Sequence, residues 1–347
     1  MNDESKSNYL DILQIFRGIA ALMIVFHHTI GSINFYYKIN HPFLNSLALI
    51  GKFGVDFFFV LSGFIISYST YYQYNKPNSF LNYIKNRLIR IYVPYLPIGI
   101  LMLVLYSVLP DLSNSDRDIS TLTSLTLLPN GNPALSVAWS LSFELCFYIV
   151  FSISFFSRRV WYYFTFVWFF MIVMVNYSFL ESIKHLNNPF LTVLFSTYNL
   201  EFILGFFLAI LVLKKYAINL KLILVILSIL IGCFLYCIVC KYLIFYFSIN
   251  FLFVLISFII IYLAVVYYPK KIKKTVLFML IGNASYSIYL IHNPLQMLIV
   301  RFFPKTNSPL SVTFVLFFVL VIASLIGYLY YLFFEKEAIQ RIKKMFL

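Results

Sequence analysis

Residues 17–28 read Arg17-Gly18-Ile19-Ala20-Ala21-Leu22-Met23-Ile24-Val25-Phe26-His27-His28, and this stretch decides the fold class. It places one arginine and two histidines in a segment that is otherwise apolar enough to cross a bilayer. Ionisable side chains inside lipid are costly and usually have a function. The stretch therefore predicts a membrane-spanning helix that carries part of a functional site.

The geometry of an α-helix separates the roles of the two histidines. Eleven residues turn through three revolutions and about 20°, so Arg17 and His28 project from nearly one face, about 16 Å apart along the axis. His27 points about 80° away from Arg17. We therefore expect Arg17 and His28 to share a cavity, with His27 as a neighbour. The alternative is a pair of packed histidines and an arginine that extends to the membrane interface.

The composition excludes a water-soluble globule. The 347 residues are 62% hydrophobic and 11% charged, whereas soluble domains have about 25% charged residues. All four cysteines lie in apolar runs, which argues against a secreted disulfide framework. Cys237 and Cys240 form a CxxC pattern without a second pair of ligands, so we expect helix packing there, no metal and no bound cofactor.

Apolar stretches of roughly 20 residues predict an all-α integral membrane protein with about ten transmembrane helices. Gly51, Gly54 and Gly63 make the second stretch the one expected to be broken. The connection at 111–135 is too short for a further domain, so residues 1–347 are expected to form a single polytopic membrane domain without a fused soluble domain. The predicted spans are 10–33, 44–70, 91–110, 136–156, 160–180, 190–213, 220–240, 243–268, 275–300 and 310–334.

Basic residues predict the orientation, because short cytoplasmic loops retain Lys and Arg. An even number of spans with both termini in the cytoplasm places most of them inside, and it explains the net charge of +14 without a nucleic-acid partner. The residues expected outside are Lys38, Arg117, Lys184, Lys241, Arg301 and Lys305. Those expected inside are Lys76, Lys85, Arg87, Arg90, Arg158, Arg159, Lys214, Lys215, Lys221, Lys270, Lys271, Lys273, Lys274, Lys336, Arg341, Lys343 and Lys344.

Five motifs then occur in order along the chain, and together they carry a resemblance. The chain resembles the acyltransferase-3 family of integral membrane enzymes, many of which O-acetylate cell-surface carbohydrates. The motifs are Arg17 to His28; Gly54-Val55-Asp56-Phe57-Phe58-Phe59-Val60-Leu61-Ser62-Gly63-Phe64; Arg87-Leu88-Ile89-Arg90; Trp139-Ser140-Leu141-Ser142-Phe143-Glu144; and Ser285-Tyr286-Ser287-Ile288-Tyr289-Leu290-Ile291-His292.

The resemblance implies roles for the arginines and for one histidine. Arg17 and His28 match the family's arginine-to-histidine motif, whose ten intervening residues select His28 over His27. Arg87 and Arg90 match its paired-arginine motif. Many relatives use acetyl-CoA as donor, and the resemblance implies an integral protein of a bacterial cytoplasmic membrane.

Acyl transfer from a thioester to a hydroxyl makes the same roles plausible on chemical grounds. The reaction needs a base for the hydroxyl proton and a group that stabilises the oxyanion. His28 is the expected catalytic residue, either as general base or as a transient acyl carrier. Arg17 would position it or stabilise the thioester. Glu144 would orient His28, bind a sugar hydroxyl or hold two helices together.

Depth along the helices predicts a polarised site. Arg17, Arg87 and Arg90 are expected near the cytoplasmic side, whereas His28, Glu144 and His292 are expected in the outer half of the membrane. The guanidinium fork suits the phosphates of coenzyme A. The alternative for Arg87 and Arg90 is an anchor that binds lipid headgroups.

The remaining candidates are polar or aromatic residues of the motifs that would line a cavity or bind the acceptor. Asp56 follows Lys52 by four residues, so an ion pair with a buried lysine is its first interpretation. The other candidates are Ser62, Trp139, Ser285, Tyr289 and His292, of which the last three share one helical face and would equally suit interhelical hydrogen bonds.

Three further acidic residues receive no chemical role from the sequence. Glu201 lies in the sixth predicted span without a motif companion. Glu335 and Glu337 are expected at a solvated helix end.

The function expected from these patterns is that of a membrane O-acyltransferase, in the first instance an O-acetyltransferase. It would move an acyl group from cytoplasmic acyl-CoA to a hydroxyl of a cell-surface glycan or its lipid-linked precursor. The expected partners are acyl-CoA, that glycan and the lipid bilayer. The competing function is a polysaccharide or small-molecule transporter that uses the intramembrane charges as a proton relay.

Overall fold

The computed structural model describes residues 3–39, 42–74, 76–109, 118–176, 188–216, 218–239, 246–267, 276–305 and 308–346. Within these ranges the chain is almost entirely helical and contains no β-strand, only one isolated bridge between Ile119 and Asn132. Nine helices of this part are long and apolar enough to cross a membrane. The prediction of an all-α membrane protein is therefore confirmed.

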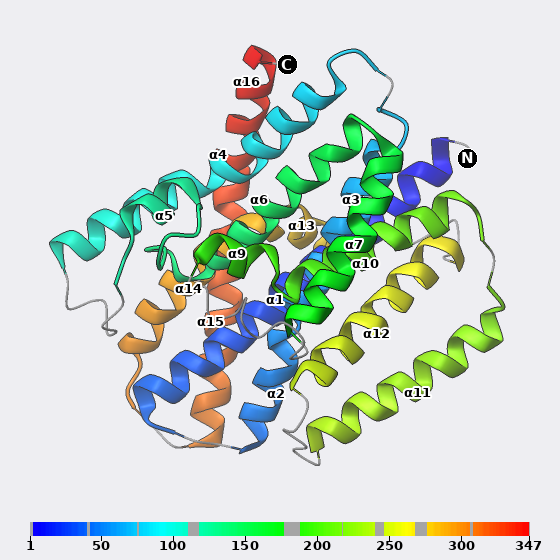
Figure 1. The fold of residues 1–347 in the computed structure, drawn as a ribbon. Coiled ribbons are helices and arrows are strands. Elements are labelled where there is room, and N and C mark those ends of the chain that lie inside the picture. Colours follow the sequence, from blue (N-terminus) through cyan, green and yellow to red (C-terminus); the bar gives the residue numbers. More distant parts are fainter. Residues whose placement is uncertain are drawn as a thin grey trace. The chain divides into compact units, whose positions relative to one another are not determined.

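The helices follow one another along the chain with few long connections (Figure 1). They are α1 Asp3–Tyr37, α2 Pro42–Lys52, α3 Gly54–Thr70, α4 Ser79–Val108, α5 Thr121–Thr126, η2 Ser136–Ala138, α6 Trp139–Phe151, η3 Ser152–Phe155, α7 Arg158–Asn176, α9 Pro189–Leu194, α10 Tyr198–Leu213, α11 Leu220–Val239, α12 Tyr246–Tyr267, α13 Val276–Asn283, α14 Ser285–Phe302, α15 Pro309–Tyr330, the π-helical turn η5 Tyr331–Glu335, and α16 Lys336–Phe346.

Several helices extend beyond the predicted apolar spans. α1 covers 35 residues rather than 10–33, and α4 begins at Ser79 rather than 91. The third predicted span therefore missed three helical turns that carry Arg87 and Arg90. Hydropathy finds only the apolar part of a helix, whereas backbone hydrogen bonds continue through polar residues beyond it.

The predicted break in the second span is confirmed at Phe53, where α2 ends and α3 begins. A second break was not predicted. The ninth expected span, 275–300, consists of α13 and α14, which are separated at Ala284. α13 has eight residues, or about 12 Å, which is less than half of a hydrocarbon core of about 30 Å. The nine helices that are long and apolar enough to span a membrane do not include α13 or α14, so the described residues hold the ninth expected span as two separate helices.

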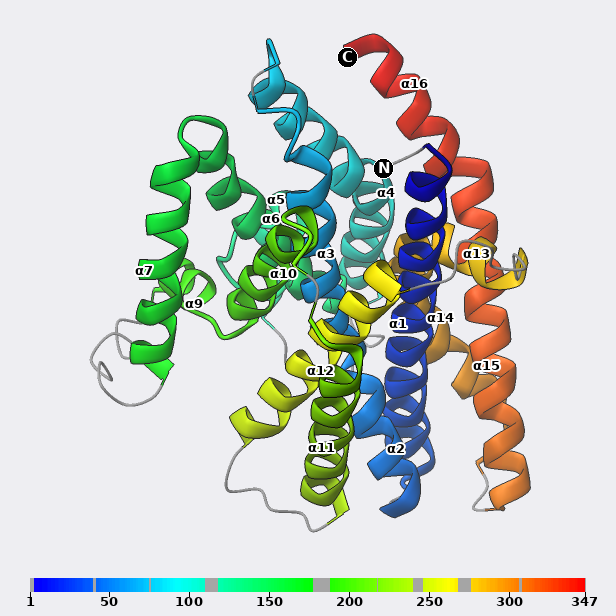
Figure 2. The same ribbon diagram turned by 90° about the vertical axis from the view of Figure 1, so that its right-hand side faces the viewer.

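The chain divides into two compact units, each of which is described by itself. Unit 1 comprises residues 1–69, 201–286 and 295–325. In it, α1 packs against α2 and α13, and α11 packs against α12 (Figure 2). Two of its apolar cores are centred on Val60 and Ile261, and on Ile30 and Val319.

Unit 2 comprises residues 70–200, 287–294 and 326–347. The Tyr95 hydroxyl donates to the Ser124 carbonyl at 2.6 Å, and the Tyr92 hydroxyl donates to the Thr126 carbonyl. α5 therefore packs against the middle of α4, so this part of the 111–135 connection folds back beside a spanning helix. The Tyr330 hydroxyl also donates to the Pro94 carbonyl at 2.9 Å, inside the proline-containing stretch of α4.

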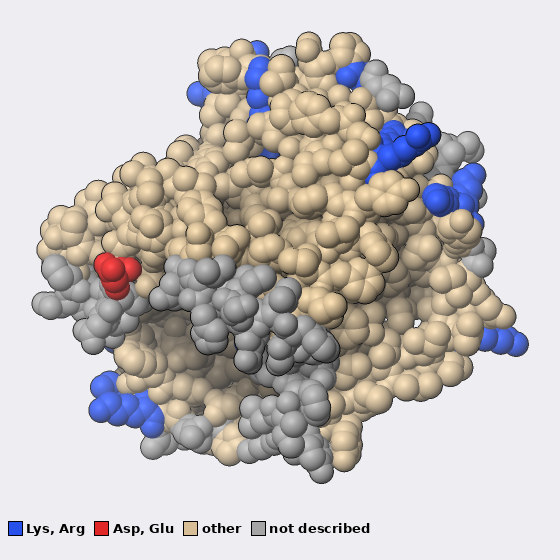
Figure 3. Space-filling view, in the orientation of Figure 1, with Lys and Arg blue, Asp and Glu red and all other residues tan. Residues whose placement is uncertain are grey.

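The surface in Figure 3 carries few acidic or basic side chains over most of the visible described residues, as lipid contact requires.

Cys146, Cys233 and Cys237 are free thiols. Some sequence predictions lie outside the described residues. These concern Arg117, Lys184, Cys240, Lys241, Lys270, Lys271, Lys273 and Lys274.

Candidate functional site

The two histidines of α1 differ in how they are held. His27 Nδ1 lies 2.6 Å from the Ala48 carbonyl oxygen of α2. A carbonyl only accepts, so Nδ1 of His27 carries the proton and donates it. The His28 ring lies edge-on against the His27 ring, with 5.0 Å between centroids. His27 is thus anchored to a neighbouring helix, and it packs against half-buried His28.

The break between α2 and α3 lies against α1 between Arg17 and His28. A Cβ atom on Gly51 would come within 2.6 Å of the Met23 carbonyl oxygen, and one on Gly54 within 2.6 Å of the Ala20 carbonyl oxygen. Only glycine permits such close backbone approach. The local fold therefore fixes the stretch of α1 that joins the two candidate residues.

A third glycine contact fixes α1 at the level of Arg17. A Cβ atom on Gly18 would lie 2.9 Å from the Gly282 backbone nitrogen in α13, and one on Gly282 would lie 2.1 Å from the Gln14 carbonyl oxygen. Arg17 itself is half-buried, with Nη1 3.5 Å from Gln14 Oε1. Its backbone position is thus set by helix packing.

Asp56 pairs with a residue that sequence reasoning left without a role. The Asp56 and Glu201 carboxyl groups are hydrogen-bonded to each other, and the residues are 3% and 4% exposed. Lys52 acts on Asp56 electrostatically, as the sequence suggested. Two carboxylates contain no donor, so one of the pair must hold a proton.

Close packing of α3 on α10 brings these two acids together. A Cβ atom on Gly63 would lie 2.2 Å from the Phe202 carbonyl oxygen, and one on Gly205 would lie 2.1 Å from the Val60 carbonyl oxygen. Gly63 is therefore a packing residue and does not break the helix. The only sequence signal for the pair was an acidic residue, Glu201, inside an apolar span.

Two further candidates belong to unit 1. Ser62 is half-buried on α3, rotated by about 240° from Asp56 around the helix axis. Ser285 begins the first turn of α14 and is fully buried, and its Oγ has no hydrogen-bond partner among the described residues. Sequence reasoning missed a buried polar contact nearby in the same unit, with Thr29 Oγ1 3.2 Å from Gln296 Oε1.

In unit 2, Arg87 lies between two aromatic rings. Its guanidinium carbon is 5.7 Å from the Tyr83 ring centroid and 5.5 Å from the Tyr148 centroid. Arg87 Nε is buried without a hydrogen-bond partner among the described residues. Cation–π contacts use the flat face of a guanidinium, whereas its N–H groups point outward in its plane. Arg87 thus keeps donor capacity for a further ligand. Arg90 is half-buried one turn later.

Glu144 is joined to the same region by one tyrosine. The Tyr148 hydroxyl donates to Glu144 Oε1, and the Tyr148 carbonyl accepts from the Tyr83 hydroxyl at 3.1 Å. The sequence-based depth argument separated Glu144 from the paired arginines. In the structure, Tyr148 of α6 contacts both Glu144 and Arg87, so these two residues lie beside the same side chain within unit 2.

Tyr289, Trp139 and His292 make structural contacts in unit 2. The Tyr289 hydroxyl lies 2.7 Å from both the Val137 carbonyl and Ser140 Oγ. The Trp139 ring packs 5.2 Å from the Tyr198 ring. His292 is fully buried, and its Nδ1 lies 2.6 Å from the Tyr289 carbonyl. The Tyr289 contacts hold α14 against η2 and the start of α6, the Trp139 contact joins α6 to α10, and the His292 contact lies within α14.

The prediction for Glu335 was wrong, whereas that for Glu337 was right. Glu335 is 6% exposed and accepts a hydrogen bond from the Ser287 hydroxyl. It lies in the π-helical turn, one turn before the helix becomes polar, and therefore still faces α14. Glu337 is exposed and pairs with Arg341 at 3.1 Å. Among the described residues no three His, Cys, Asp or Glu side chains gather as a metal site would require.

Comparison with known proteins identifies the family. The model of an acyltransferase domain, acyltransferase-3, matches residues 9–329 of the chain. No curated protein and no solved structure matches. The family model covers almost the whole chain, so the protein belongs to the acyltransferase-3 family and is a membrane acyltransferase.

Proposed function

Because the chain is a member of the acyltransferase-3 family, we propose that it is an O-acetyltransferase of a bacterial cytoplasmic membrane. It takes the acetyl group from cytoplasmic acetyl-CoA and transfers it to a hydroxyl of a cell-surface glycan or its lipid-linked precursor. Both termini are cytoplasmic in this proposal, as the basic residues predict. The family match favours this enzyme over the competing transporter.

The observation that carries the proposal is the state of the two histidines on α1. His27 Nδ1 donates a hydrogen bond to the Ala48 carbonyl, at 2.6 Å, and this bond holds α1 against α2. His28 is only half-buried, and its ring forms a T-shaped contact with that fixed ring. A positioned imidazole beside a rigid support is what general base catalysis requires. This supports His28 as the catalytic residue.

The proposed acyl transfer has two alternative mechanisms, general base catalysis and a covalent acyl-histidine intermediate. In the first, His28 removes the acceptor hydroxyl proton while the oxygen bonds to the thioester carbonyl carbon; the carbon–sulfur bond then breaks, and the CoA thiolate takes up a proton. In the second, a His28 ring nitrogen attacks the thioester carbonyl carbon, the carbon–sulfur bond breaks, and CoA leaves as a thiol with the imidazole proton. The acceptor oxygen then bonds to the acetyl carbon, the carbon–nitrogen bond to His28 breaks, and the hydroxyl proton passes to the imidazole. Arg17 stabilises the thioester oxygen or positions His28 in either form.

Arg87 and Arg90 bind the donor phosphates in this proposal. The buried Arg87 Nε without a partner among the described residues supports it, as do the tyrosine rings that hold the guanidinium by its face. Glu144, tied to Tyr148, fixes the tyrosine that Arg87 packs on. The candidates for contact with the acceptor are Asp56, Ser62 and Ser285 in unit 1, and Trp139, Tyr289 and His292 in unit 2.

The experiment that tests this function uses the purified protein in lipid nanodiscs with radiolabelled acetyl-CoA and a panel of bacterial glycans and lipid-linked oligosaccharides. We expect label in an alkali-labile ester on the acceptor, together with free CoA. Transport of the same glycans into vesicles without any acyl transfer, across several acyl-CoA donors, would contradict the proposal.

A further inference from the structure

The C-terminal helix α16 packs against α4 within unit 2, and the two helices cross in Figure 1. Lys85 Nζ of α4 donates to the Phe346 carbonyl at the end of α16, at 3.0 Å. α15, η5 and α16 form a continuous helix of 38 residues, about 57 Å long, whereas a bilayer core requires about 30 Å. α16 therefore extends beyond the core and remains attached to the first turns of α4.

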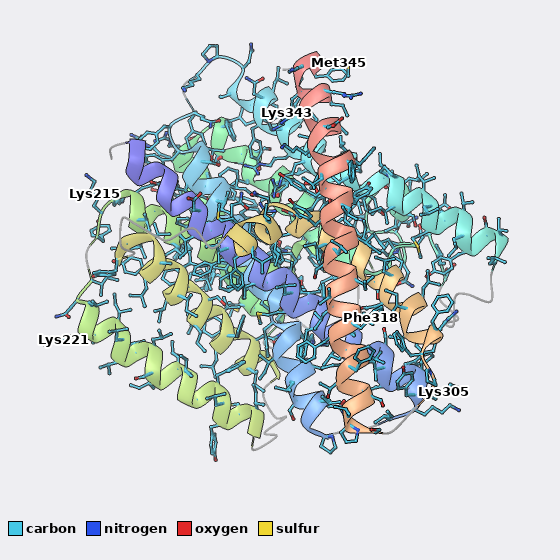
Figure 4. The ribbon with its side chains drawn as sticks, turned by 180° about the vertical axis from the view of Figure 1, so that it is seen from behind. Lys215, Lys221, Lys305, Phe318, Lys343 and Met345 are labelled. Carbon is cyan, nitrogen blue, oxygen red and sulfur yellow. The ribbon has the colours of Figure 1, made fainter. Side chains whose placement is uncertain are left out.

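This packing adds a third cation to the paired arginines. Lys343, which is labelled on α16 in Figure 4, is half-buried and interacts electrostatically with both Arg90 and Arg87. The neighbouring Lys344 is exposed. Arg341 is neutralised by Glu337. Lys343 is thus the cation of this helix that faces the arginines.

Three like charges in one place repel one another, and the repulsion grows as water is excluded. Among the described residues, no carboxylate forms an ion pair or hydrogen bond with Arg87, Arg90 or Lys343. Glu144 accepts its hydrogen bond from Tyr148. Glu144 is near the cluster but forms no ion pair with it, so an anion would still stabilise the gathered cations. Arg87 Nε is a buried donor without a hydrogen-bond partner among the described residues.

We propose that α4 and α16 form a phosphate-binding site in which Lys343 acts with Arg87 and Arg90. The ligand is the phosphate-bearing part of acyl-CoA, an assignment that rests on the proposed function. Coenzyme A carries a diphosphate and a separate phosphate monoester, so it has more charge than two arginines neutralise. Guanidinium groups bind phosphate oxygens in pairs, and a lysine ammonium adds a movable point charge.

The experiment compares Lys343→Gln with the matched control Lys344→Gln, which removes the same charge from the adjacent exposed position. In nanodiscs of neutral lipid, we expect K343Q to raise KM for acetyl-CoA about tenfold or more, with kcat little changed. K344Q should behave as wild type, and Lys343→Arg should restore most of the affinity. With acetyl-pantetheine, which has no phosphates, the difference between K343Q and wild type should disappear.

Binding of CoA measured without turnover, by calorimetry, separates the two proposals. If no acyl transfer is found but K343Q weakens CoA binding and K344Q does not, the proposed function fails and the site stands. An equal effect of K343Q and K344Q would overturn the site. Unchanged CoA binding in K343Q, together with loss of a co-purified anionic lipid, would assign the site to a lipid headgroup and overturn the donor assignment.

Discussion

The polar side chains of α1 and those of α4 and α6 are held by different means. Around α1, glycines bring backbones into contact, as Gly54 does against Ala20 and Gly282 against Gln14. Around α4 and α6, tyrosines bridge the helices by hydrogen bonds and ring contacts. Backbone contact leaves no freedom to adjust, whereas tyrosine side chains can change rotamer. The first region should therefore be sensitive to added volume, and the second to lost hydroxyl groups.

The largest stability effect is expected at the buried acid pair of unit 1. Glu201→Leu removes the hydrogen-bond partner of Asp56, which is 3% exposed, and should lower the free energy of unfolding by about 3 kcal/mol. Glu201→Gln keeps a donor toward Asp56 and should cost much less. Denaturant unfolding in mixed micelles measures the difference. Equal losses for the two variants would mean that the hydrogen bond contributes nothing.

A smaller loss is expected when volume is added beside α1. Gly54→Ala places a Cβ atom 2.6 Å from the Ala20 carbonyl oxygen and should lower the free energy of unfolding by about 2 kcal/mol. Gly31→Ala is the control on α1 itself, because a Cβ atom there meets no atom within 4 Å. It should be neutral or slightly stabilising. If the two variants unfold alike, close packing does not fix this part of α1.

The smallest effect is expected in unit 2. Tyr148→Phe keeps the ring that Arg87 packs on but removes the hydroxyl that donates to Glu144. We expect the free energy of unfolding to fall by about 1 kcal/mol. Tyr163→Phe, at an exposed position on α7, is the matched control and should leave it unchanged. A loss well above that for Gly54→Ala would reverse the comparison between the two regions.

The two regions also differ in how far the sequence predicts them. The relation of Arg17 to His28 depends only on helical periodicity within one segment, so the twelve residues from Arg17 to His28 are enough to predict their shared face. The break at Phe53 was likewise marked by local glycines. In contrast, the Asp56–Glu201 pair and the packing of Arg87 on Tyr148 depend on which helices meet, which periodicity does not encode. The Tyr148–Glu144 bond joins positions i and i+4 of α6 and was open to prediction from periodicity. The sequence signals were the lone acid Glu201 in an apolar span and the four-residue spacing of Glu144 and Tyr148.

Helix ends were predicted least well, and for a physical reason. The apolar part of α4 begins only after Arg90. The predicted span of 91–110 therefore left out the first three turns of the helix, which carry both arginines. Glu335 was expected in solvent because two charged residues follow it closely, yet the helix turns its side chain towards Ser287. Burial at a helix end is decided by the neighbouring helix, and this information lies elsewhere in the chain.

The central claim is that His28 performs the transfer and that His27 supports it. The most direct test is the rate of acetyl transfer by His28→Ala and His27→Ala, each purified in nanodiscs and shown to be folded by its unfolding midpoint. The account predicts that His28→Ala lowers the rate by a factor of about 10² to 10⁴, whereas His27→Ala retains a substantial rate because its role is to anchor the ring beside His28. Full activity of a folded His28→Ala protein would contradict the account.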